Sequence, residues 1–321
     1  MRPAAAGALA ASALAAVAAG AWFGVHRSSR AARSWRPGTG SSRHSHEHVL
    51  GARVWGEGEV VVVLLSGLAA SQRYWGDAYD GLARVATVVA IDPLGFGSSM
   101  ELDDGQDTSD PALHVRMVEQ TLADLGLAGR PTIAVGHSMG ASLALRWAAS
   151  TDAVREVVCF AAPLYRGESE VADRMRHLGW LEAMLARGPL AERVCHWMCE
   201  NRGTAQWLAV AVSPALPVRI ARDSVLHTWP GYIGAFRALI EDPGWSEALE
   251  ALSRRRVPVQ LVYGAEDRVP VDGRAEELAR HHDAVTVRTV AGGHDVPLAR
   301  AEECADIVGA RVAAIASAET E

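Results

Sequence analysis

Seven short apolar runs, separated by stretches with helical patterning, constrain the fold of this chain more than any other feature. Their letters are HVLGARVWG, EVVVVLLSG, VATVVAID, TIAVGHS, REVVCFAAP, VPVQLVYGAED and AVTVRTV. Continuous runs rich in Val, Ile and Leu are typical of strands covered on both faces, and their alternation with helices is typical of a parallel sheet. The sequence therefore predicts an α/β fold with a mostly parallel central sheet and helices on both faces.

The longest interval without a strand pattern lies between Pro163 and Arg256, and helical patterning such as YIGAFRALIED fills it. A helical block inserted between two strands of one sheet predicts a cap, residues 164–245, on a core made of residues 48–163 and 246–321. Most tryptophans of this block are expected to pack the cap's own core, and a minority would line an apolar pocket. They are Trp180, Trp197, Trp207, Trp229 and Trp245.

Residues 4–25 contain no charged side chain, and about twenty such residues suffice to cross a bilayer. They fit a membrane anchor, a secretory signal segment or a soluble alanine-rich extension. The arginines that follow them favour an anchor with the catalytic domain in the cytoplasm, and a signal segment would instead imply secretion. Residues 26–47, rich in Arg, Ser, Gly and His, predict a flexible basic linker outside the fold.

Charge and composition exclude several classes of function. The chain carries a net charge of −7, and its first 48 residues are basic, so the body is acidic and nucleic acid is not expected as a partner. The chain contains no lysine, which excludes Schiff-base chemistry and a P-loop. The CHWMC stretch at residues 195–199 and the HSHEH stretch at residues 44–48 suggest metal ligands, but an apolar helical face and a solvated segment explain them better. We therefore expect no metal and no cofactor.

A glycine-flanked serine stands where the fourth apolar run gives way to a helical stretch, in Gly136-His137-Ser138-Met139-Gly140. A serine on a sharp turn from strand to helix projects its Oγ clear of the sheet, and glycines two residues before and after give the turn room. The N–H of Met139, at the start of the helix, can hold a developing oxyanion. This pattern predicts that Ser138 is a nucleophile.

A serine nucleophile needs a base and the base needs an acid, expected after this turn in the order serine, acid, histidine. Glu266 and Asp267 follow the sixth run, and His294 follows the seventh. Both positions lie at the edge of the sheet where Ser138 lies and where ligands bind in open α/β sheets. The histidines at residues 281–282 precede the last run and are expected at the opposite edge.

Together these motifs resemble the α/β-hydrolase superfamily over about residues 48–315. IDPLGFGSS resembles the family's D-x-x-G-x-G-x-S loop, GGH matches its histidine loop, and YGAEDRVP resembles its G-x-x-D-x-x-x-P loop with Pro270 one position early. The resemblance implies the α/β-hydrolase fold and gives the acid role to Asp267. The family usually has His-Gly after the third strand, where this chain has Ser66-Gly67, and we assign the second oxyanion donor to the backbone N–H of Leu68.

The resemblance also narrows the chemistry, because haloalkane dehalogenases and epoxide hydrolases of this fold use aspartate where Ser138 stands. Ser138, Asp267 and His294 predict a serine hydrolase that cleaves a small, largely apolar carboxylic ester or thioester through an acyl-enzyme. A hydrolase of carbon–carbon bonds, a cofactor-free perhydrolase or an acyltransferase would use the same triad. A non-catalytic, membrane-tethered binding protein that kept the fold is a further alternative.

Overall fold

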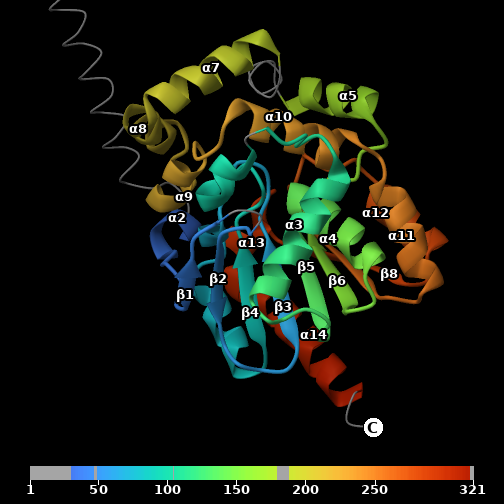
Figure 1. The fold of residues 1–321 in the computed structure, drawn as a ribbon. Coiled ribbons are helices and arrows are strands. Elements are labelled where there is room, and N and C mark those ends of the chain that lie inside the picture. Colours follow the sequence, from blue (N-terminus) through green and yellow to red (C-terminus); the bar gives the residue numbers. More distant parts are fainter. Residues whose placement is uncertain (1–29, 47–48, 104, 179–187, 319–321) are drawn as a thin grey trace, which may run out of the picture.

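A central sheet of eight strands, in the order β1-β2-β4-β3-β5-β6-β7-β8, organises the computed structural model (Figure 1). The model describes residues 30–318 except 47–48, 104 and 179–187. The pairs from β4 to β8 are parallel, whereas β1 and β2 are antiparallel to their neighbours. The seven runs in the sequence form β2 to β8, so the predicted mostly parallel sheet is confirmed. The strands are β1 (Ser41–Arg43), β2 (Ala52–Trp55), β3 (Val61–Leu65), β4 (Thr87–Ile91), β5 (Thr132–His137), β6 (Val154–Phe160), β7 (Val259–Gly264) and β8 (Val285–Val290).

Helices cover both faces of this sheet, as expected for strands that are apolar on both sides. Residues Val61, Val63 and Leu65 of β3 pack in one buried cluster with α3, α4 and α11, whereas Val62 and Leu64 pack in another with η2 and α14. The core helices are α2 (Arg30–Ser34), η1 (Gln72–Tyr74), η2 (Asp77–Arg84), η3 (Gly97–Asp103), α3 (Pro111–Asp124), α4 (Met139–Ser150), α11 (Trp245–Arg254), α12 (Arg274–His281), α13 (Val296–Ala299) and α14 (Ala301–Ala318).

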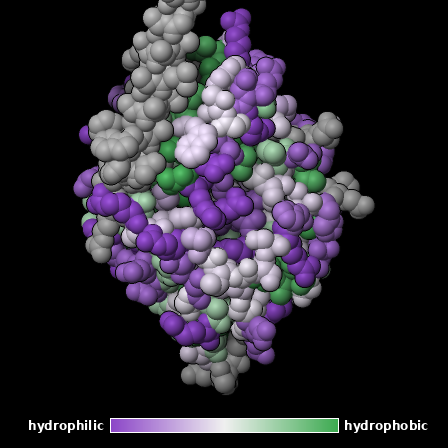
Figure 2. Space-filling view, turned by 90° about the vertical axis from the view of Figure 1, so that its left-hand side faces the viewer, coloured by the Kyte–Doolittle hydropathy of each residue, from purple (hydrophilic) through white to green (hydrophobic). Residues whose placement is uncertain are grey.

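The inserted cap lies across the top of the sheet in Figure 1. Its elements are α5 (Glu168–Leu178), α7 (Pro189–Glu200), α8 (Arg202–Val212), α9 (Val218–Asp223), α10 (Trp229–Phe236) and the π-helical turn η4 (Arg237–Glu241). The face in Figure 2 is largely hydrophilic below, and its hydrophobic areas gather in the upper half, where the cap lies. Exposed apolar side chains of α7 and α8 include Trp197 and Trp207. These helices form the insertion that the sequence predicts between β6 and β7.

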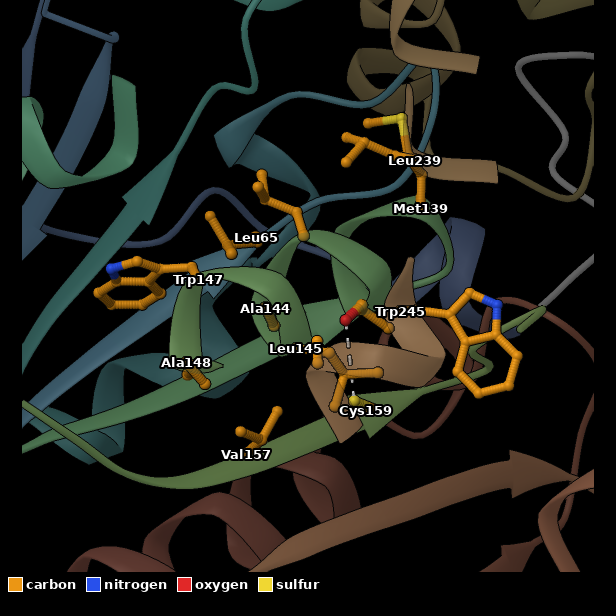
Figure 3. Packing of buried hydrophobic residues seen from close by; sticks show 14 of the residues in the cluster. Leu65, Met139, Ala144, Leu145, Trp147, Ala148, Val157, Cys159, Leu239 and Trp245 are labelled. Carbon is orange, nitrogen blue, oxygen red and sulfur yellow. Dashed lines mark hydrogen bonds between the residues drawn. The ribbon is translucent and has the colours of Figure 1, made fainter. Parts of the chain in front are cut away.

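The cap and the core share one apolar cluster beneath the cap (Figure 3). Met139 and Trp147 of α4, Leu239 of η4 and Trp245 of α11 are all buried in it. Trp245 is 2% exposed and its indole N–H donates to the Tyr165 carbonyl at 2.7 Å. The helix that carries the nucleophile turn is therefore anchored on one side by the sheet and on the other by the last elements of the insertion.

The N-terminal region differs from its prediction as a flexible linker. Within residues 30–46, α2 contributes Ala31 to the core, and β1 pairs antiparallel with β2 at the edge of the sheet. Thr39 donates its N–H to Asp80, and its carbonyl accepts from Arg53. β1 could not be predicted as a strand because its side chains are polar and exposed. An edge strand of this kind lacks the apolar pattern that identifies buried strands in a sequence.

The suggested membrane or signal segment, residues 4–25, lies outside the described residues. Within the part of the chain that the structure describes, none of the helices combines the length and the apolar character needed to span a membrane.

Candidate active site

Ser138 lies at the sharp junction of β5 and α4, where the sequence places the nucleophile. Its backbone has φ 52° and ψ −119°, a conformation that L-residues rarely adopt. The Ser138 N–H donates to the Phe160 carbonyl at 2.9 Å, which ties the turn to β6. The strained turn holds the Oγ above the carboxyl end of the sheet.

Both glycines of the turn are required by close backbone contacts. A Cβ on Gly136 would lie 2.2 Å from the carbonyl oxygen of Gly140, and a Cβ on Gly140 would lie 2.3 Å from that of Leu65. Contacts this short cannot be relieved by rotating a side chain, because the atoms met are backbone atoms. The motif therefore has its spacing for a steric reason, as the sequence predicts.

Ser138, His294 and Asp267 lie in one hydrogen-bonded chain. The Ser138 hydroxyl lies 2.9 Å from His294 Nε2, and His294 Nδ1 lies 3.0 Å from Asp267 Oδ2. The hydroxyl donates to Nε2 and the Nδ1–H donates to the carboxylate, the arrangement of a base held by an acid. The Asp267 side chain is 1% exposed, and its Oδ1 also accepts from the Val269 N–H at 2.9 Å. These two bonds fix the carboxylate, which in turn fixes the imidazole.

The competing residues do not join this chain. Glu266 is exposed, and its backbone N–H donates to the Gly292 carbonyl. The histidines at residues 281–282 lie at the C-terminal end of α12, where the His282 ring contacts the Ser253 hydroxyl at 3.1 Å. The structure thus places Asp267, and not Glu266, beside His294.

The oxyanion donors expected from the sequence lie around Ser138. A Cβ on Gly67 would lie 3.2 Å from the Ser138 Cβ, so the loop after β3 packs directly on the nucleophile turn. Among the described residues, no acceptor pairs with the backbone N–H of Leu68 or of Met139. Leu68 lines the cavity above Ser138, whereas the Met139 side chain is fully buried and does not line it. Their roles as donors stay predictions that this geometry accommodates.

A cavity of about 310 Å³ opens above Ser138 and His294. Its core wall follows the strand ends, and its cap wall comes from α5, α9, α10 and η4. The side chains that face it are mostly apolar, among them Leu68, Met175, Leu216, Ile220, Tyr232, Phe236 and Ile240. The arrangement places a serine hydroxyl, hydrogen-bonded to an imidazole, on the floor of a small hydrophobic pocket.

Comparisons with known proteins agree with this fold. The model of the Alpha/beta hydrolase family matches residues 62–307, which span β3 to α14 and hold all three members of the Ser-His-Asp chain. The chain belongs to this family. The superfamily expected from the motifs is thereby confirmed. No curated protein matched the chain in a separate comparison.

Solved structures similar to this α/β hydrolase differ in the activities that their names describe. A carboxylesterase from Nitrososphaera gargenis has a TM-score of 0.61 and 15% identity, covering 86% of this chain and 99% of its own. A bromoperoxidase from Bacillus anthracis has a TM-score of 0.60 and 18% identity, covering 81% and 93%. An enol-lactonase from Burkholderia xenovorans LB400 has a TM-score of 0.57 and 18% identity, covering 81% and 94%. These TM-scores show that the fold is shared, and identities this low do not assign a reaction to this chain.

The tryptophans of this α/β hydrolase do not have the positions expected from the sequence. Trp197 and Trp207 are 42% and 47% exposed, Trp245 packs in the core, and Trp229 lines a different hollow, so no described tryptophan faces the cavity. Tyrosine, phenylalanine and aliphatic residues line it instead. The sequence does not specify which side of each cap helix faces the cavity, because these helices are short and contact one another as well as the core. Trp180 lies outside the described residues.

A second polar group, which was not predicted from the sequence, lies beside the triad. His137 stacks on Tyr74 at 4.8 Å and 12°, and its Nε2–H donates to the His294 carbonyl at 3.0 Å. The Tyr74 hydroxyl donates to Asp295 at 3.0 Å. His137 and Asp295 each adjoin a triad residue in sequence, so inspection of the motif neighbours could have found them. These contacts brace the loop that carries His294.

Suspected metal ligands do not gather in the described part of the chain, which contains no group of three or more His, Cys, Asp or Glu side chains placed to hold an ion. Cys195 is buried on α7, and the Cys199 thiol donates to the His227 carbonyl at 3.4 Å. Burial raises the pKa of the Cys195 thiol to about 12, which suits its expected role as a small apolar residue.

Acidification is expected to destabilise this protein through its buried histidines. Burial lowers the pKa of His137 to about 4, with repulsion from His294 as a further cause, and burial lowers the pKa of His227 to about 4. Between pH 6.5 and 4 the unfolded chain therefore binds protons that the folded chain does not. The free energy of unfolding should fall by about 1.4 kcal/mol per pH unit for each of these groups as the pH drops through this window.

Urea unfolding at pH 7, 6 and 5 measures this slope. His227→Gln should remove the contribution of one histidine, whereas His281→Gln, which changes an exposed ring, should leave the slope unchanged. A slope that His227→Gln does not alter would show that other groups cause the acid sensitivity.

Proposed function

We propose that this α/β hydrolase is a serine hydrolase that cleaves a small, largely apolar carboxylic ester or thioester. The observation that carries the proposal is the 2.9 Å contact between the Ser138 hydroxyl and His294 Nε2 at the floor of an apolar cavity. A serine hydroxyl is a poor nucleophile unless a base takes its proton, and the His294 base is already oriented by Asp267.

In the first half of the reaction the Ser138 Oγ attacks the carbonyl carbon while its proton passes to His294 Nε2. The carbonyl oxygen becomes an oxyanion, for which the N–H groups of Leu68 and Met139 are the proposed donors, each typically worth roughly 3–4 kcal/mol. His294 then returns the proton to the departing alkoxide or thiolate. The alcohol or thiol leaves, and the acyl group stays on Ser138.

In the second half a water molecule attacks the acyl-enzyme and gives its proton to His294. The tetrahedral intermediate collapses, the Ser138 oxygen recovers the proton, and the carboxylic acid is released. Asp267 remains ionised throughout and stabilises the imidazolium that forms in both halves.

The cavity supports an apolar acyl or alcohol group rather than a charged one. At about 310 Å³ it lies at the lower end of the size range of small-molecule pockets. The ionisable side chains that face it are the imidazoles of His137 and His294, tyrosine phenols and a single carboxylate, Asp295. An anionic substituent would lose its hydration here without gaining a counter-ion, which is costly. The one carboxylate, Asp295, already accepts from the Tyr74 hydroxyl.

A panel of p-nitrophenyl esters of graded acyl length, together with a fluorophosphonate probe, tests the proposal. We expect turnover to be highest for short to medium acyl chains and the probe to label wild-type protein on Ser138. The matched control is Ser142→Ala, which changes a buried serine of α4 close to Ser138 in the sequence. An unlabelled wild-type protein, or labelling that survives in Ser138→Ala, would refute the serine mechanism.

Perhydrolysis and acyl transfer use the same acyl-enzyme with another acceptor in place of water. Product analysis separates them from hydrolysis, because carboxylic acid must form in a 1:1 ratio with alcohol if water is the acceptor. Formation of a peracid or of a new ester would instead show that a molecule other than water accepts the acyl group.

A further inference from the structure

The loop that carries the Leu68 N–H is joined to the cap by a buried hydrogen bond. We define the oxyanion loop as residues 66–71. At its end, the Ser71 hydroxyl donates to Asp223 Oδ2 at 2.6 Å. Ser71 is 3% exposed and Asp223 is 7% exposed, although the two residues are 152 positions apart in sequence. A bond this short between a hydroxyl and a carboxylate, shielded from water, is of the strong, charge-assisted kind.

The oxyanion loop needs to be held, because its own backbone does not favour its shape. Ala69 has φ 55°, in the left-handed region that is unfavourable for residues with a Cβ. The loop is closed by Ser66, whose hydroxyl donates to the Ser71 carbonyl at 2.9 Å. Ser66 thus supports the loop at the position where the family usually has histidine. The first residue of the loop, Ser66, is therefore bonded to the last, Ser71, and Ser71 is bonded in turn to Asp223.

On the cap side, the bond reaches the wall of the substrate cavity. Asp223 is the last residue of α9, and Ile220 and Ser224 on either side of it face the cavity. Arg73 also contacts both oxygens of Asp223 at 3.3 Å, but its side chain is 54% exposed. Because solvent and salt screen an exposed arginine, the Ser71 bond is the stronger of the two attachments.

We propose that Ser71 and Asp223 are positioning residues that set the Leu68 N–H for oxyanion stabilisation and make its placement depend on the cap. The inference rests on the proposed serine hydrolase function. An oxyanion donor must lie within about 2.7–3.1 Å of the oxygen that develops charge. Loss of the bond lets Ala69 relax toward a favourable conformation and moves the adjacent Leu68 N–H out of that range.

The test compares Ser71→Ala, Asp223→Asn and Asp223→Ala with wild type on the best ester of the panel. Removing an oxyanion donor typically costs about 10²–10³-fold in kcat, so displacing one should lower kcat by about 10–100-fold while KM changes by less than about threefold. Asp223→Asn keeps the volume and an accepting oxygen, and it should show a smaller loss than Asp223→Ala. In the double variant Ser71→Ala/Asp223→Ala the losses should not add, because both changes remove the same bond.

A trifluoromethyl ketone inhibitor supplies the readout that a merely structural role would not move. It forms a tetrahedral adduct with Ser138 that carries an oxyanion, whereas the product carboxylic acid binds without one. The inhibition constant of the ketone should rise by the same factor by which kcat falls, and that of the acid should stay within about threefold, since only the first depends on the oxyanion donors. The matched control is Ser150→Ala, which removes a serine–carboxylate bond of 2.9 Å to Glu119 on the surface.

The outcomes separate this inference from the function on which it rests. If wild-type protein hydrolyses the esters but Ser71→Ala and Asp223→Ala keep wild-type kcat, or if their losses appear in KM without a change for the ketone, the positioning role is wrong. If wild-type protein has no turnover and no labelling, the proposed function fails first. Thermal unfolding of each variant verifies its fold, and Asp223→Asn provides the isosteric change with the least effect on packing.

Discussion

Replacing Ser138 with alanine is expected to lower kcat for a p-nitrophenyl ester by about 10⁶-fold, the loss seen when the nucleophile of a Ser-His-Asp enzyme is removed. The Ser138 hydroxyl lies 2.9 Å from its base and stands on a strained turn above the sheet, and among the described residues no other hydroxyl hydrogen-bonds to His294 Nε2. The residual rate reflects binding and oxyanion stabilisation alone. Steady-state assays, with enzyme concentration set by absorbance, measure the loss directly.

His294→Ala should cost nearly as much, and the double variant Ser138→Ala/His294→Ala should be no slower than either single variant. Residues that act as one unit show this failure of additivity, because the second change removes nothing that still works. Independent losses that multiply would contradict a shared role. Turnover that survives both changes would place the chemistry at another site.

Asp267→Asn is expected to lower kcat by about 10⁴-fold while leaving the fold intact. The carboxylate accepts from His294 Nδ1 at 3.0 Å and from the Val269 N–H, and its side chain is 1% exposed. An amide in the same place can donate to Nδ1, which moves the imidazole proton to Nε2. In that tautomer Nε2 cannot accept the Ser138 proton, so the base is lost although every atom keeps its place.

Glu266→Gln is the matched control, because it makes the same chemical change one residue earlier. Its side chain is exposed, and only its backbone bonds to the loop that carries His294. We expect activity within about twofold of wild type. A larger loss in Glu266→Gln than in Asp267→Asn would overturn the assignment of the acid. Both variants are compared by kcat/KM across pH, since the tautomer change should lower the whole profile.

The strands and the turn of the nucleophile could be predicted because local patterns specify them. Strands β3 to β6 are buried along almost their whole length, which leaves a continuous apolar signal in the sequence. The spacing of Gly136 and Gly140 follows from a single turn, in which a Cβ on either residue would lie 2.2–2.3 Å from a backbone oxygen. The order of Ser138, Asp267 and His294 then placed them at one edge, because parallel strands end at the same side of a sheet.

Other features depended on contacts between distant segments, which no local pattern encodes. β1 is polar because it lies at an edge of the sheet. It pairs with β2, although the sequence predicted a flexible linker in this segment. The cavity wall is aliphatic and tyrosine-rich where inward-facing tryptophans were expected, because the packing of α9, α10 and η4 decides which sides of these helices face Ser138. The Ser71–Asp223 bond joins residues separated by 152 positions.

The sequence by itself determined strands β2 to β8, the family and the identity of the three residues of the Ser-His-Asp chain, because short local patterns specify each of them for a steric or chemical reason. The tertiary structure alone decided the distances within that chain, the lining of the cavity and the attachment of the oxyanion loop to the cap. The physical reason is that apolar periodicity specifies which residues are buried, whereas the partner that each buried group meets is set by how whole elements pack.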